Sequence, residues 1–100
     1  MYVVLLEYVD TSEAALQALD ALVPEHRAFL DRHYAAGHFV VSGAQIPRTG
    51  GVILARPMER ATLDAILAED PFHREKRASY RIVEFTPSKF ASGAEAFFKE

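Results

Sequence analysis

Four histidines and one acidic turn are the residues of this chain best suited to chemistry. His26 and His33 lie in a segment whose apolar residues recur at helical spacing, so both belong to one helix face. Histidine serves as a general acid or base near neutral pH because its ordinary pKa is about 6.5. The two histidines are two helical turns apart, roughly 10 Å, which is too far to share one metal ion directly. We therefore expect no metal site.

The acidic turn Glu69-Asp70-Pro71-Phe72 offers a carboxylate that could work with a histidine. As a structural element it ends a helix, since a residue before proline is disfavoured in the α conformation, and Phe72 would enter the core. As a functional element, Asp70 would accept a hydrogen bond from histidine Nδ1–H, fix the tautomer and raise the basicity of the ring. These residues by themselves leave both interpretations open.

Composition narrows the classes of function. The chain has 100 residues, half of them apolar and a quarter charged, which is typical of one soluble domain. It has no cysteine and no serine-hydrolase or phosphate-binding motif, so thiol, acyl-transfer and nucleotide chemistry lack support. A net charge of −3 argues against nucleic-acid binding, and the apolar runs are too short to span a membrane. The N-terminus does not resemble a signal peptide, so we expect a cytoplasmic protein.

The apolar pattern predicts the element order strand, helix, strand, strand, helix, strand. The expected strands are 2–9, 38–42, 51–56 and 79–85. Pro24 should divide the first helical region into two segments because proline lacks the N–H that a helix needs, and His73–Arg77 should form a connector with at most one helical turn. The βαββαβ order predicts an α+β, ferredoxin-like sandwich, in which two helices cover one face of a four-stranded antiparallel sheet.

The other face of the predicted sheet needs a cover. Strands 2–9 and 51–56 are apolar on both sides, whereas the helices suffice for one face only. A second copy of the chain, sheet against sheet, is the simplest cover, so we expect a homodimer of the dimeric α+β barrel type. The single domain would have a core of about residues 1–90, and a tail, 91–100, that could cross to the partner.

Several short motifs together resemble the YciI-like (YCII-related) family over about residues 1–90. They are, in chain order, Pro24-Glu25-His26, Gly37 eleven residues after the histidine, Ser42-Gly43 and Asp70-Pro71-Phe72. Members of this family are small ferredoxin-like dimers with a His/Asp active-site dyad, and one relative is a dehydrochlorinase acting on a chlorinated hydroxymuconate. The resemblance implies a dyad of His26 and Asp70, with Ser42, Gly43 and Phe72 beside the pocket. This chain has Arg27 where leucine is common, so substrate identity is not transferred.

Three functions are consistent with these observations. In the first, a cofactor-free enzyme uses His26 as general acid or base and Asp70 as its orienter, for elimination, isomerisation or dehydrochlorination of a small organic acid. Arg81 would hold the substrate carboxylate if it faces inward; otherwise it is an exposed strand arginine. In the second, the dimer binds or senses a small ligand without catalysis. In the third, the pair is structural. A cleft that opens onto both side chains would favour chemistry or binding, and a closed contact would favour structure.

Overall fold

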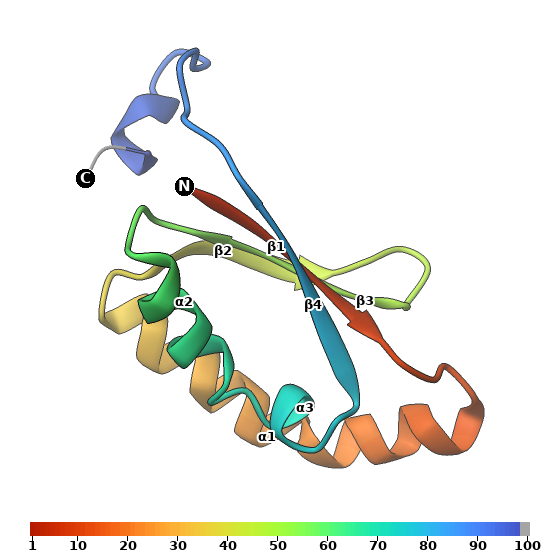
Figure 1. Ribbon diagram of the computed structural model, residues 1–100. Coiled ribbons are helices and arrows are strands. Elements are labelled where there is room, and N and C mark those ends of the chain that lie inside the picture. Colours follow the sequence, from red (N-terminus) through yellow and green to blue (C-terminus); the bar gives the residue numbers. More distant parts are fainter. Residues whose placement is uncertain (99–100) are drawn as a thin grey trace.

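A four-stranded antiparallel sheet with helices on one face forms the frame of the protein (Figure 1). The computed structural model describes residues 1–98, and the strand order is β2-β3-β1-β4. The elements are β1 (Tyr2–Tyr8), α1 (Glu13–Ala35), β2 (Phe39–Ala44), β3 (Gly50–Ala55), α2 (Arg60–Leu67), α3 (Pro71–Arg74), β4 (Ala78–Glu84) and the 3₁₀ turn η1 (Ala94–Phe97). This is the predicted ferredoxin-like α+β arrangement, and the predicted strand limits are displaced by only one or two residues.

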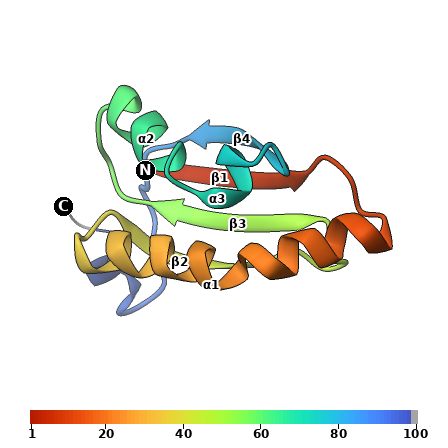
Figure 2. The same cartoon turned by 90° about the horizontal axis from the view of Figure 1, so that it is seen from below.

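The core lies between the sheet and the helices. Along β1, the alternate residues Tyr2, Val4 and Leu6 are buried on the helix side. They pack in clusters that include Phe29 of α1 and Leu63 of α2. Seen from the helix side, α1 runs along β2 and β3, whereas α2 and α3 lie over β1 and β4 (Figure 2). Within this single helical layer, α1 therefore meets α2 and α3 above the middle of the sheet.

Helix α1 is one continuous helix, so the prediction that Pro24 divides it was wrong. Its N-terminus is capped by Ser12, whose hydroxyl accepts the Ala15 N–H at 3.3 Å. Pro24 leaves the carbonyl of Asp20 without its helical donor, but both residues are exposed and water can hydrate that carbonyl. The helix ends at Ala35, and Gly37 just beyond the C-cap adopts φ +80°, as expected for a glycine that terminates a helix. One helix thus carries both His26 and His33.

The turn after α2 begins a short helix earlier than the sequence predicts. The single helical turn allowed for the connector 73–77 is α3, which starts two residues earlier, at Pro71, and ends at Arg74. Asp70 is its N-cap and accepts the Phe72 N–H at 3.0 Å, while Pro71 takes the first helical position, where its missing N–H costs nothing. The same cap that starts α3 therefore fixes the Asp70 side chain.

The sheet face opposite the helices is apolar and partly open. Val41 is 55% exposed and Val83 46% exposed, and between them lie half-buried residues of β1 and β3 such as Leu54. The C-terminal segment lies on this side of the sheet, away from the helices (Figure 1). There Arg56 Nη1 donates to the Phe97 carbonyl at 3.0 Å. Residues 99 and 100 of the predicted tail lie outside the described residues, and its crossing to a partner stays a prediction.

None of the helices within residues 1–98 combines the length and the apolar character that a membrane crossing requires.

Candidate active site

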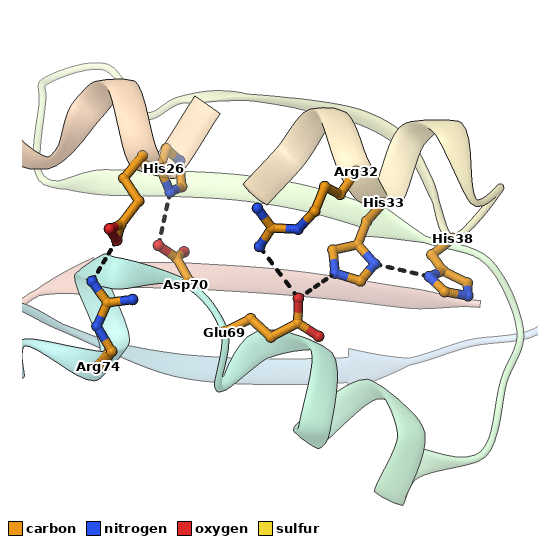
Figure 3. Close-up of polar contacts among 8 residues, drawn as sticks. His26, Arg32, His33, His38, Glu69, Asp70 and Arg74 are labelled. Carbon is orange, nitrogen blue, oxygen red and sulfur yellow. Dashed lines mark hydrogen bonds and ion pairs between the residues drawn. The ribbon is translucent and has the colours of Figure 1, made fainter. Parts of the chain in front are cut away.

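His26 and Asp70 are brought together from positions 44 residues apart. His26 lies in the middle of α1 and Asp70 at the cap of α3, and His26 Nδ1 is 2.9 Å from Asp70 Oδ1 (Figure 3). This contact was predicted and is confirmed. His33, the other histidine on this helix face, contacts Glu69 instead.

Asp70 is completely buried and accepts hydrogen bonds from three groups. Oδ1 accepts from His26 and from the Phe72 N–H, and Oδ2 accepts the Tyr80 hydroxyl at 2.6 Å. These donors stabilise an ionised carboxylate away from water. Burial and, next, the negative charge of Asp70 raise the pKa of Tyr80, so its hydroxyl keeps its proton. A carboxylate cannot donate, and we therefore assign a proton to His26 Nδ1.

The imidazole of His26 is held by ring packing as well as by Asp70. It stacks on Phe72 with a centroid separation of 4.2 Å and an interplanar angle of 8°. The His26 side chain is 17% exposed. With Nδ1 carrying the proton, a neutral ring has its lone pair on Nε2, for which the described residues provide no hydrogen-bond partner. The arrangement thus yields an oriented basic nitrogen.

A cavity of about 360 Å³ adjoins His26, between α1 and the β2–β3 hairpin. Ser42, Gly43 and Phe72 line it, in agreement with the positions that the family resemblance implies. Most of the remaining lining is apolar or glycine, and includes Leu6, Tyr8, Val23, Leu30, Gly50, Gly51, Val52 and Ile53. Asp70 lies behind His26 and does not reach the cavity. Of the two dyad residues, only His26 therefore borders the cavity. The cleft expected for chemistry or binding was one that opens onto both side chains, and this one opens onto the histidine but not onto Asp70.

The prediction that Arg81 lines this pocket was wrong. Arg81 pairs with Leu5 in the β1–β4 register and is exposed on the open sheet face, where its Nε lies 3.4 Å from Glu7 Oε1. Side chains alternate along a strand, and because Tyr80 points to Asp70 on the helix side, its neighbour must point away. The inward orientation considered for Arg81 is therefore excluded.

Two arginines that sequence reasoning did not select, Arg27 and Arg48, line the cavity instead. Arg48 donates to Asp20 Oδ1 at 2.6 Å, and its guanidinium carbon lies 6.0 Å from the centre of the Tyr8 ring. Arg27 follows His26 on α1. The sequence offers a signal for Arg27, because it is adjacent to the candidate base, but none for Arg48, whose place depends on the folding of the hairpin.

The hairpin wall of the cavity is pressed against β1. A side chain at Gly50 would place its Cβ 1.8 Å from the Leu6 carbonyl oxygen, so only glycine fits there. Gln45 Nε2 donates to the Leu6 and Gly51 carbonyls at 3.3 and 3.1 Å, which joins the hairpin to the end of β1. Much of this wall of the cavity therefore consists of hairpin backbone packed closely against the backbone of β1.

A second polar network lies two turns along α1. His33 Nε2 is 2.9 Å from Glu69 Oε1, and His33 Nδ1 is 2.9 Å from His38 Nδ1 (Figure 3). When Glu69 accepts from Nε2–H of an uncharged His33 ring, Nδ1 of that ring accepts from His38 Nδ1–H. His38 is half-buried. Within residues 1–98, no group of three or more suitable side chains is placed to hold a metal ion.

A larger hollow, of about 690 Å³, lies along α2, α3 and the edge strand β4. Tyr80 and His73 are among its lining residues, and their rings stack at 5.4 Å. Neither His26 nor Asp70 lines it. The smaller cavity is therefore the better candidate site, because it alone adjoins the oriented histidine.

An antiparallel β2-β3-β1-β4 sheet with a helix histidine bonded to a buried aspartate defines a ferredoxin-like α+β protein with a candidate His/Asp dyad. Residues 1–86 match the YCII-related domain, and the chain belongs to that family. The resemblance stated from its motifs is thus confirmed. Comparison with curated proteins and with solved structures gave no match.

Proposed function

We propose that this protein is a cofactor-independent cytoplasmic enzyme that moves a proton on a small organic acid, with His26 as the general acid or base. The observation that carries the proposal is the pairing of His26 Nδ1 with the buried Asp70 beside a cavity. Asp70 orients the ring and stabilises the imidazolium that forms when Nε2 takes a proton. A positioned base of this kind typically accelerates a reaction by roughly 10²–10⁴-fold.

The proposed step is an elimination or an isomerisation. His26 Nε2 takes a proton from a carbon next to an electron-withdrawing carbonyl, and the C–H electron pair forms a carbon–carbon double bond. In an elimination, chloride or hydroxide leaves from the adjacent carbon with its bonding pair. In an isomerisation, an existing double bond shifts and the proton returns to a different carbon. Both steps balance without a redox partner.

A non-catalytic ligand-binding module is the alternative. It is favoured by the cavity itself, whose largely apolar lining would bind a small molecule whether or not His26 reacts. The purely structural role is less well supported, because the His26 side chain is 17% exposed and borders open space. The alternatives therefore differ in proton transfer, which can be measured directly.

Deuterium exchange tests the base. The protein would be incubated in D₂O with β-chloro acids, β-hydroxy acids and unsaturated 2-oxo acids, and loss of C–H signals would be followed by proton NMR together with chloride release. Exchange in the parent should fall by about 10²-fold or more in His26→Asn. His33→Asn, which alters a buried histidine on the same helix, is the matched control. Equal exchange by the parent and His26→Asn would refute the assignment, and binding without exchange would support the module.

We further propose that two copies pair through the open sheet face. The support is a stripe of apolar residues on the four strands that α1, α2 and α3 leave uncovered: Val3, Leu5, Val41, Leu54 and Val83. A two-fold arrangement would place this stripe against itself. The pairing would leave the helix layer, and the cavity beside His26, on the outer side of each copy.

A further inference from the structure

Arg27 is a cationic group at the cavity that has no partner among residues 1–98. Its guanidinium makes no hydrogen bond or ion pair with any residue that the structure describes. Most other arginines contact a carboxylate: Arg32, Arg48, Arg60, Arg74 and Arg81. Arg27 therefore has its donors available for a ligand, and it lines the cavity beside the candidate base.

The charges around the cavity indicate which ligand would fit. Arg48 also lines it, but its positive charge is matched by Asp20, and His26 is paired with the carboxylate of Asp70. One uncompensated positive charge remains, on Arg27. The middle of α1, not its N-terminus, borders the cavity, so no set of free backbone N–H groups is available for a phosphate. This balance suits a monoanion with two acceptor oxygens, which a guanidinium binds in bidentate fashion.

We propose that Arg27 binds the carboxylate of the ligand and sets the specificity of the cavity for small carboxylic acids. The inference rests on the proposed function for the site and adds the group that recognises the substrate. The volume of about 360 Å³ is near the lower end of ligand sites, which span about 300–1,000 Å³, so the acid is small. Because Arg27 and His26 both line this small cavity, a carboxylate held by Arg27 lies near the carbon that faces Nε2.

Binding of non-reacting ligands tests this role apart from catalysis. The probes are crotonate and benzoate, each compared with its neutral amide, and inorganic phosphate, titrated while the backbone amides of the cavity are followed by NMR. The parent should bind each carboxylate about tenfold or more tightly than the amide, the usual effect of a charge-assisted hydrogen bond. Arg27→Gln should lose this preference, and Arg27→Lys should keep part of it.

Arg60→Gln is the matched control, since it also removes one exposed helix arginine but lies outside this cavity. It should behave as the parent does. The inference is overturned if Arg27→Gln keeps the preference, if neither carboxylate shifts the cavity amides, or if phosphate shifts them at lower concentrations than the carboxylates. His26→Asn should still prefer carboxylates, so a failure of the proposed base leaves this result unchanged.

Discussion

Asp70 is the residue on which the candidate site is built. It caps α3, orients His26 and accepts the Tyr80 hydroxyl, all within a fully buried environment. A buried carboxylate is tolerable only when its oxygens are satisfied, and here each of them is. When His26 is replaced, each oxygen of Asp70 therefore still accepts one hydrogen bond, because two donors remain.

Replacement of His26 by asparagine should therefore be mild for stability. The variant loses one hydrogen bond at the edge of a cavity, a cost near 1 kcal/mol. For a domain of this size that lowers the melting temperature by about 4–8 °C. Thermal unfolding followed by circular dichroism at pH 7 measures it. A drop beyond roughly 12 °C would instead indicate a desolvated structural pair.

Tyr80→Phe should be more damaging than its position in an edge strand suggests. It removes the donor to Asp70 Oδ2 and leaves a buried carboxylate oxygen unsatisfied, at a cost of about 1–3 kcal/mol. Tyr34→Phe is the control, because the Tyr34 hydroxyl bonds to Ser42 at an exposed position. Chemical denaturation of both variants compares the losses. Equal losses would show that the Tyr80 hydroxyl does not support Asp70.

At the scale of elements, the turn between α2 and α3 holds α1 at two points. The consecutive residues Glu69 and Asp70 reach His33 and His26, which are two helical turns apart (Figure 3). Arg74 of α3 also contacts Glu25 of α1. The position of the base relative to the sheet thus depends on this turn as well as on helix packing.

The Glu69 contact should make stability depend on pH. The hydrogen bond from His33 is the main cause that holds the pKa of Glu69 below its ordinary value of 4.5, and the hydrogen bond and charge of Arg32 act in the same direction. A depressed folded-state pKa stabilises the protein above the unfolded pKa, and this contribution is lost as pH falls through the folded value. Glu69→Gln should thus melt below the parent at pH 7, and the difference should shrink below about pH 4.

Glu95→Gln, in the exposed η1 turn, is the matched control and should follow the parent at every pH. A Glu69→Gln variant whose deficit is the same at pH 7 and at low pH would show that the carboxylate charge does not contribute.

The sequence predicted the element order and the dyad because both depend on local signals. Apolar periodicity indicated the strands and helices, and the spacing around His26 and Asp70 carried the family resemblance. The effect of Pro24 on the helix was predicted wrongly because a helix tolerates proline where the carbonyl that loses its donor is exposed to water. Tyr80 and Arg48 were missed because they reach the site only through sheet register and hairpin folding. Arg81 was assigned to the helix side of the sheet, but side chains alternate along β4, so that side belongs to its neighbour Tyr80.

At the scale of the whole molecule, the open sheet face should decide the assembly. We expect the parent to sediment as a dimer at micromolar concentration. Val83→Glu, which adds a charge within the apolar stripe on β4, should shift the protein to monomer. Val9→Glu is the control, since Val9 is 64% exposed in the connection after β1 and lies outside the stripe. A stable monomer of the parent, or equal effects of both variants, would contradict the proposed pairing.

The close approach of Gly50 to β1 has an evolutionary consequence. A side chain at position 50 cannot fit in this wall of the cavity without displacing β1. A mutation of Gly50 should therefore destabilise the folded protein. The opposite wall is a helix surface, where Arg27 is exposed and can change with little effect on the core. Divergence of ligand preference among descendants of this protein should therefore accumulate at Arg27 on α1, while Gly50 stays glycine.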